Sequence, residues 1–347
     1  SHLLEPSRLQ KIQYSEAFNE TYWGKSRVTV TQNNVVSPDG TLNADKLIET
    51  SDTGLHAISA NTTVTSGVSH TFSVFIKKGS SSLVQFLFGT NNVTGNPYVN
   101  FDVNNGLVQN NGTTSANIEN YGDGWYRCST TYVTATTALT NFISPIQSIS
   151  DSRVSSFTGN VNNNIYIYGA QVEQGSYPTS YIPNYGTSAG ITRSAETANG
   201  AGDASTFNDS EGVLMAEISA LANSGNGQIR ILEQGVLNSV IMEFRNSGTT
   251  LRTYIFNGNA TNQFFSETNI NPNDNIKIAL KYKQNDCSLY LNGFVRATDT
   301  IATMPSNLNE LSFNQGNGGN PFYGSTKQIQ YFDSALNDSD LEKITSW

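Results

Sequence analysis

Residues 124–133 read Gly-Trp-Tyr-Arg-Cys-Ser-Thr-Thr-Tyr-Val, and this stretch decides the fold class. Aromatic, threonine and valine side chains favour strands. Successive side chains of a strand point to opposite faces. One face therefore carries Trp125, Arg127, Ser129, Thr131 and Val133, and the other carries Tyr126, Cys128, Thr130 and Tyr132. A long strand with two distinct faces predicts an antiparallel sheet.

Further strand patterns surround this stretch, at residues 71–77, 83–88, 98–103 and 164–173. Asn104-Asn105-Gly106 turns the third of them into the next strand, because Asn and Gly tolerate the positive φ of hairpin turns. Strands at even spacing with polar turns between them predict a sandwich or jelly roll.

The second half of the chain repeats this pattern. Residues 276–282 and 287–291 alternate apolar and polar side chains, and Asn292-Gly293 turns the chain once more. These features predict an antiparallel meander with a tight hairpin.

A short helix is predicted at the end of the sequence. Asn337 can cap it, Asp338 and Asp340 fall in its positive first turn, and Leu336 can pack onto Leu341.

A proline-broken segment and a run of small residues at 199–203 separate the two halves. We therefore expect an all-β chain of two antiparallel sandwich (jelly-roll) domains in tandem, followed by a short helix. The predicted boundaries are 13–197 for the first domain, 198–206 for a linker and 207–347 for the second domain.

Composition excludes two classes of partner. The 347 residues carry a formal net charge of −9 without a Lys/Arg cluster, whereas a nucleic-acid surface needs concentrated positive charge. No apolar run approaches the length of a membrane-spanning helix, so we expect no membrane insertion. Cys128 and Cys287 fall in different predicted domains, which favours two buried free thiols over a disulfide.

Specific motifs in the first domain carry a resemblance. They are Gln13-Tyr-Ser-Glu-Ala-Phe18, Tyr22-Trp-Gly-Lys25, Ser37-Pro-Asp-Gly-Thr41, Gly122-Asp-Gly-Trp-Tyr-Arg-Cys128 and the closing run Tyr166-Ile-Tyr-Gly-Ala-Gln-Val-Glu-Gln-Gly-Ser-Tyr-Pro-Thr-Ser-Tyr-Ile-Pro183. This domain resembles the carbohydrate-binding-module-like jelly roll of phage tail and virion proteins. One departure is Tyr168, at which the resemblance leads us to expect Trp.

The second domain resembles the laminin G/concanavalin A-like sandwiches. The residues that carry this resemblance are Ile276–Tyr282, Ser288-Leu-Tyr-Leu-Asn-Gly293, Phe322-Tyr-Gly324, Ile329-Gln-Tyr-Phe332 and Ala335-Leu-Asn-Asp-Ser-Asp-Leu341.

Together the resemblances imply a non-catalytic carbohydrate-binding protein of a virion or an extracellular setting. Its partners would be a surface polysaccharide and other virion proteins. Phage fibres and spikes are often homo-oligomers, although no heptad signature is present. Two alternatives stay open: a purely structural spike protein without a ligand, and an accessory binding region of a polysaccharide-degrading enzyme.

Catalytic motifs are weak in this sequence. Residues 186–190 match G-x-S-x-G, but they follow a proline-broken loop rather than a strand. The histidines, His2, His56 and His70, form no paired motif. We therefore expect no catalytic residues, although carboxylates brought together by the fold remain open.

Sugar recognition needs flat aromatic rings and short polar groups, and five residues are candidates for it. Trp125 and Arg127 share a strand face that is either a concave ligand surface or the rim of the core, with the indole N–H bonded to a backbone carbonyl. Tyr166 and Tyr168 share a face opposite to two isoleucines, and this tyrosine face is either a platform or a surface that packs on the second domain. Tyr98 is the fifth candidate.

We expect no required cofactor, although the resemblance leaves room for a structural calcium ion. Glu16 in the opening motif and Glu173 on the last strand would hold it together with backbone carbonyls, unless both are simply solvated. In the second domain, the turn-rich loop 314–321 either frames a ligand or is an ordinary surface loop.

Overall fold

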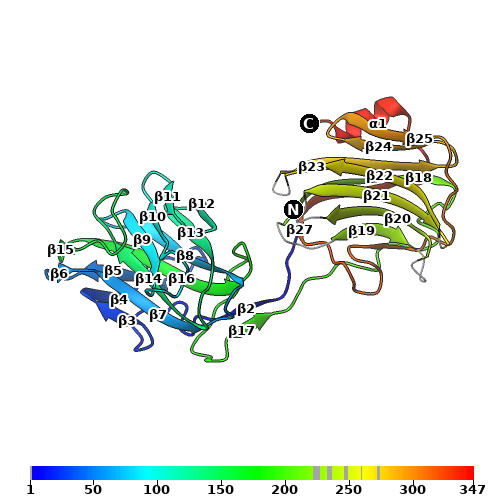
Figure 1. Ribbon diagram of the computed structural model, residues 1–347. Coiled ribbons are helices and arrows are strands. Elements are labelled where there is room, and N and C mark those ends of the chain that lie inside the picture. Colours follow the sequence, from blue (N-terminus) through cyan, green and yellow to red (C-terminus); the bar gives the residue numbers. More distant parts are fainter. Residues whose placement is uncertain (1, 222–226, 233–236, 246–248, 259, 272–273) are drawn as a thin grey trace. The chain divides into compact units, whose positions relative to one another are not determined.

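The computed structural model describes residues 2–221, 227–232, 237–245, 249–258, 260–271 and 274–347. Within these ranges the chain is built from β-strands and one short helix, as predicted. It forms two compact units, which Figure 1 shows. The N-terminal unit is Ser7–Ser194, and the C-terminal unit combines Ser1–Pro6 with Ala195–Trp347.

The division between the units differs from the predicted boundaries. Residues 198–206 were expected to form a linker, but Ala201 makes a β-bridge with Leu311. The amide of Phe313 donates to the carbonyl of Ala198 at 2.9 Å. This segment is therefore part of the C-terminal unit, because its backbone finds hydrogen-bond partners there. The local run of small residues did not reveal these distant partners.

The N-terminal unit contains two six-stranded sheets, with the orders β12-β13-β8-β16-β5-β4 and β11-β10-β9-β14-β7-β3. In the first sheet the strands are β4 (Val28–Val35), β5 (Ala44–Glu49), β8 (Ser69–Lys78), β12 (Ser115–Gly122), β13 (Trp125–Val133) and β16 (Asn164–Gln174). In the second they are β3 (Gly24–Ser26), β7 (Ala57–Thr63), β9 (Leu83–Phe88), β10 (Tyr98–Asp102), β11 (Leu107–Asn111) and β14 (Ala138–Pro145). Two small ladders pair β2 (Arg8–Gln10) with β17 (Ile191–Arg193) and β6 (Thr53–Gly54) with β15 (Phe157–Thr158).

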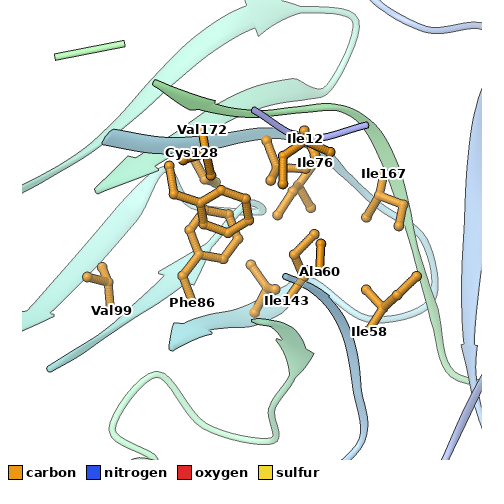
Figure 2. Packing of buried hydrophobic residues seen from close by; sticks show 14 of the residues in the cluster. Ile12, Ile58, Ala60, Ile76, Phe86, Val99, Cys128, Ile143, Ile167 and Val172 are labelled. Carbon is orange, nitrogen blue, oxygen red and sulfur yellow. The ribbon is translucent and has the colours of Figure 1, made fainter. Parts of the chain in front are cut away.

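The core of this unit lies between the two sheets, and Figure 2 shows part of it. Cys128 on β13 and Ile167 on β16 meet Phe86 on β9 and Ile143 on β14 there. The predicted faces of β13 and β16 are therefore confirmed. Full burial of each large apolar side chain contributes about 1.5–3 kcal/mol to stability.

The C-terminal unit is a second sandwich. Its six-stranded sheet follows β1-β27-β18-β23-β24-β25, and its five-stranded sheet follows β22-β21-β20-β19-β26. The strands of the first are β1 (His2–Leu4), β18 (Glu211–Ala220), β23 (Ile276–Lys283), β24 (Cys287–Leu291), β25 (Phe294–Asp299) and β27 (Gly324–Phe332). Those of the second are β19 (Gln228–Leu232), β20 (Ser239–Arg245), β21 (Thr250–Asn257), β22 (Ala260–Thr268) and β26 (Glu310–Ser312).

The helix α1 (Asp338–Thr345) begins as the sequence predicts. The side chain of Asn337 accepts a hydrogen bond from the amide of Asp340 at 3.0 Å. Leu341 is buried and packs in a cluster that includes Leu336. This cluster holds the helix against the six-stranded sheet.

The two cysteines, Cys128 and Cys287, are buried free thiols, as predicted. Burial raises the pKa of the Cys128 thiol well above its ordinary value, so this side chain behaves as an apolar core residue. Among the described helical residues, no helix is long and apolar enough to cross a membrane.

Candidate functional site

A groove of about 480 Å³ opens on the outer face of the first sheet of the N-terminal unit. Lys77 on β8 and Trp125 on β13 line it from the sheet. These two residues are paired in register across the two strands. The loop Val36–Gly40 lines one wall, and the turn Tyr121–Asp123 lines the other. The groove therefore combines strand residues with two loops that lie far apart in the sequence.

The first wall is held in shape by the side chain of Asp39. Its Oδ1 accepts hydrogen bonds from the amide of Thr41 at 2.7 Å and from the hydroxyl of Ser37 at 2.8 Å. Burial alone would raise the pKa of Asp39, but these hydrogen bonds outweigh it and hold the pKa well below its usual range. Gly40 has a φ of 86°, which a side chain would strain. The Ser-Pro-Asp-Gly-Thr motif therefore specifies this wall locally.

The second wall is a tight turn between β12 and β13. Gly122, Asp123 and Gly124 all have positive φ, at 82°, 50° and 79°. Glycine adopts this conformation without strain, and Asp tolerates it better than most residues. The pairing register shifts between Asn120 and Gly122, which is a local bulge. The turn directs Tyr121 and Asp123 to the groove.

Trp125 forms the floor of the groove rather than an exposed platform. Only 2% of its surface is exposed, and its indole Nε1 donates to the carbonyl oxygen of Val36 at 3.1 Å. The ammonium of Lys77 lies 5.9 Å from the indole ring centre. This geometry corresponds to the packing alternative considered for Trp125, with the indole anchoring the first wall to the sheet.

Tyr121 is the exposed aromatic residue of the groove, and it is not among the five residues that the sequence pattern predicts. It is 44% exposed and packs edge-on against Phe75, with ring centres 4.9 Å apart and planes at 81°. A signal was available, since the residue before a Gly-Asp-Gly turn lies beside the strand that follows the turn. The pairing register shifts at this residue, a bulge that the sequence pattern did not reveal.

Arg127 lies on the same face of β13 as Trp125, two residues further along the strand. Its guanidinium carbon lies 5.2 Å from the ring centre of Phe75, and its Nη2 donates to the hydroxyl of Ser73 at 3.1 Å. Only 4% of the residue is exposed, and it is not among the groove-lining residues. Arg127 thus supports the aromatic cluster beneath the groove.

Tyr166 and Tyr168 share this outer face, and Tyr168 braces the first wall. The Tyr168 hydroxyl donates to Asp39 Oδ2 at 2.9 Å and to Glu16 Oε1 at 3.2 Å. Burial and the neighbouring carboxylates raise the pKa of Tyr168 far above its usual value. Tyr166 is half-buried and packs against the cluster of Ala44, Phe75, Trp125 and Tyr168. These contacts are those of a packing surface within the N-terminal unit.

Tyr98 is not brought to this site. It lies on β10 of the second sheet, where it pairs with Leu87 and Asn111. The groove belongs to the first sheet, so of the five candidates the structure groups Trp125, Arg127, Tyr166 and Tyr168 on one face. Which sheet a strand joins is a long-range property that its own pattern does not encode.

The closing motif folds the chain back over β16. The side chain of Gln171 accepts from the amide of Ile182 at 2.7 Å, and Glu173 accepts from the amide of Thr179 at 2.8 Å. Gly169 has a φ of 61°, and a Cβ there would lie 3.0 Å from the ring of Phe75. The closing motif, which is the most specific part of the resemblance, therefore has a structural role: it fixes the segment after β16 against that strand.

The two acids considered for calcium have separate partners. Glu173 is fully buried, and Arg8 Nε lies 3.4 Å from its Oε2. Glu16 instead accepts from the hydroxyls of Tyr168 and Tyr181, at 3.2 and 3.1 Å. A cation next to Glu173 already neutralises that carboxylate, so the pair does not fit a shared calcium ion. Within the described residues, no group of three or more His, Cys, Asp or Glu forms a metal site.

Glu16 and Asp39 lie close together instead. Both accept from the Tyr168 hydroxyl, and the side-chain Nδ2 of Asn43 donates to Asp39 Oδ2 at 3.0 Å and to Glu16 Oε2 at 3.4 Å. Burial raises the pKa of Glu16, against the opposing effect of hydrogen bonds from Tyr181 and Tyr168. These acids brace the wall of the groove from behind.

The residues examined for catalysis have structural surroundings. His56 stacks on Phe157 with ring centres 4.5 Å apart, and His70 Nδ1 faces the carbonyl oxygen of Val68 at 3.2 Å. Both histidines are buried. Residues 186–190 form a turn closed by a hydrogen bond from Gly190 to Thr187, without the strand-to-helix geometry of a nucleophile elbow.

Comparisons with known proteins give no family model that matches the chain and no matching curated protein. Among solved structures, the chain is similar to the native heptameric SAP-like pentraxin from Limulus polyphemus, with a TM-score of 0.36 and 12% identity over 43% of this chain and 74% of that one. It is also similar to mouse laminin α1 chain domains LG4–5, with a TM-score of 0.28 and 9% identity over 97% and 94%. A third similarity is to the LG1–3 region of the laminin α2 chain, with a TM-score of 0.28 and 10% identity over 83% and 66%.

Proposed function

We propose that this chain is a non-catalytic carbohydrate-binding protein and that the groove of the N-terminal unit binds sugar. The observation that carries the proposal is the pairing of an exposed aromatic ring, Tyr121, with the charged side chains of Lys77 and Asp123 around one groove. The resemblance of residues 13–183 to phage tail and virion modules supports a virion-associated or extracellular setting.

The chemistry of the groove suits a polyol. A sugar ring offers an apolar face to an aromatic ring, and its hydroxyls need hydrogen-bond partners. Lys77 supplies donors and Asp123 supplies acceptors around the floor made by Trp125. Because a ligand without the matching hydroxyl leaves a polar group unpaired, such contacts discriminate between sugars.

The non-catalytic part of the proposal is supported by how the reactive side chains are used. His56 and His70 are buried with backbone carbonyl partners, while Glu16 and Asp39 hold Tyr168 and the loop of the first wall. Each of these groups already has a structural role in the fold. A general base must lie within hydrogen-bond distance of the substrate, and side chains with these structural contacts do not offer that access.

A glycan array with the whole chain tests the proposal, followed by calorimetry on the best ligand. Tyr121→Ala should weaken binding by about tenfold or more, because it removes the exposed ring. Tyr98→Ala is the matched control on the other sheet and should leave the dissociation constant unchanged. Unchanged affinity in Tyr121→Ala, or no glycan bound at all, would overturn the proposal and favour a purely structural protein. Release of reducing sugar from a bound polysaccharide would instead favour an enzyme.

A further inference from the structure

The C-terminal unit has a cavity of its own on the outer face of its five-stranded sheet. It measures about 270 Å³ and is lined by residues of β19, β20 and β21. Gln315 and Asn320, from the turn-rich loop 314–321, line it from the side. The loop is tied to the sheet, since the amide of Gln228 donates to the carbonyl of Asn320 at 3.0 Å. This loop therefore frames a cavity.

The carboxylate of Glu243, which lines the cavity, already has several hydrogen-bond partners. Glu243 is 2% exposed, and its oxygens accept from Arg245 Nε at 2.6 Å, from Gln228 Nε2 at 2.6 Å and from the Tyr254 hydroxyl at 3.0 Å. The Arg245–Glu243 ion pair neutralises both charges. The Glu243 carboxylate also attracts the Arg230 guanidinium, although no hydrogen bond joins the two.

Arg230 lines the same cavity with a charge that has no carboxylate bonded to it. The residue is 4% exposed, its Nη2 donates to the side-chain oxygen of the neutral Gln228, and its Nε has no hydrogen-bond partner. Burial lowers the pKa of Arg230 to about 10, against the opposing attraction of the Glu243 carboxylate, so the guanidinium stays charged at neutral pH. A buried cation of this kind is stabilised by an anion that completes its hydrogen bonds.

Apart from Ile241, the rest of the lining is aromatic and amide. Tyr254 and Phe256 lie next to each other on the cavity side of β21, with ring centres 5.9 Å apart. The side chain of Asn320 donates to Gln315 Oε1 at 3.3 Å, and the two amides keep further donors and acceptors. An aromatic surface beside two amides suits a ring that carries hydroxyl groups.

We infer that this cavity is a second binding site, which takes the carboxylate of an acidic sugar, such as a uronate, against the Arg230 guanidinium. The planar guanidinium matches a carboxylate in a two-pronged geometry, and the aromatic and amide lining contacts the sugar ring. The cavity lies on the face of the sheet, whereas an extended peptide adds to a sheet edge, so a sugar is favoured over an acidic peptide. The inference does not depend on the groove of the N-terminal unit.

Ligand-observed saturation-transfer NMR on the whole chain tests this site, with sodium glucuronate and sodium galacturonate as probes. Glucose is the neutral reference, and sodium sulfate, sodium phosphate and a short polyglutamate peptide are competitors. We expect a signal from at least one uronate that glucose does not give. Arg230→Gln should weaken uronate binding by about tenfold or more, since it removes a charge-assisted hydrogen bond to the carboxylate.

Arg296→Gln is the matched control, because Arg296 lies on β25 of the other sheet of the same unit. It should leave uronate binding unchanged, and hydrogen exchange over β19–β21 should show that Arg230→Gln keeps its fold.

Three results would overturn the inference: uronate binding that survives Arg230→Gln, equal binding of glucose, and displacement by polyglutamate or by inorganic anions at lower concentration than by uronate. If Arg230→Gln does not fold, the same comparison is made with Arg230→Lys, which keeps the charge but loses the planar fork and should also bind more weakly.

Discussion

Two buried arginines, one in each unit, lie on outward-facing sheet surfaces with the same exposure of 4%. Each has one hydrogen bond to a neutral side chain: Arg127 to Ser73, and Arg230 to Gln228. In both cases the Nε atom has no partner. By burial and hydrogen bonding alone, the two residues are equivalent.

Their surroundings separate them. Arg127 lies over Phe75, whose ring is also contacted edge-on by Tyr121 and Tyr181. Arg230 borders a cavity. The aromatic ring gives the first guanidinium a permanent partner, whereas the second has space in which a ligand can fit. The role of a buried charge is therefore determined by what occupies its remaining side.

Removal of the Phe75 ring, over which the Arg127 guanidinium lies, tests this difference most strongly. Phe75→Ala should lower the free energy of unfolding of the N-terminal unit by about 3–5 kcal/mol, because it deletes a buried aromatic core contact and leaves Arg127 unsupported. Phe256→Ala, at a half-exposed position near Arg230, should cost less than about 1.5 kcal/mol. Denaturant unfolding followed by hydrogen exchange of peptides from each unit measures both values, and equal losses would show that the two surfaces are built alike.

A second, smaller effect distinguishes the two arginines of the C-terminal cavity. Arg245→Met should lower the stability of that unit by about 1–3 kcal/mol, because it leaves the buried Glu243 without its cation. Arg230→Met should leave stability unchanged or slightly raised, because it removes a buried charge that has no bonded carboxylate. Thermal unfolding of both variants under identical buffer checks this. A larger loss in Arg230→Met would mean that Arg230, rather than Arg245, neutralises Glu243.

The stability that Glu16 and Asp39 give to the first wall of the groove should depend weakly on pH. Because the folded-state pKa of Glu16 is raised, its contribution to stability is present below its unfolded pKa and is lost as pH rises through the folded value. The pKa of Asp39 is lowered, so its contribution is present above the unfolded pKa and is lost as pH falls. At neutral pH, Glu16→Gln should therefore stabilise slightly and Asp39→Asn should destabilise, each by less than about 1 kcal/mol because solvent screens these groups. Melting curves between pH 3 and pH 8 test the signs, and two shifts of the same sign would contradict them.

Local patterns in the sequence were enough to predict much of the fold. The two faces of β13, the apolar face of β16 and the capped helix at Asn337 follow from side-chain periodicity and capping chemistry. These features depend on residues a few positions apart. Where a strand joins a sheet depends on distant partners, and for this reason Tyr98 was grouped with residues of the other sheet.

The candidate site was predicted less completely. Trp125 and Arg127 were placed on the right face, but their burial follows from loops that fold back over the sheet, at Val36 and around Tyr181. Tyr121 was missed because the groove that it lines also needs the loop Val36–Gly40, about 80 residues earlier in the chain. The cluster around Arg230 was also missed, because it joins β19, β20 and β21 with a loop some 85 residues further along the chain, a separation that strand periodicity does not bridge.

The pairing of β1 with β27 has a consequence for the order of synthesis. Leu4 is buried in the C-terminal core and lies opposite Gly324, so the edge of that sheet joins segments about 320 residues apart. At a translation rate of about 5–20 residues per second, the first segment leaves the ribosome tens of seconds before its partner exists. All the strands of the N-terminal unit emerge within that interval. That unit is therefore able to close first, while residues 2–4 remain an unpaired strand until β27 has been translated.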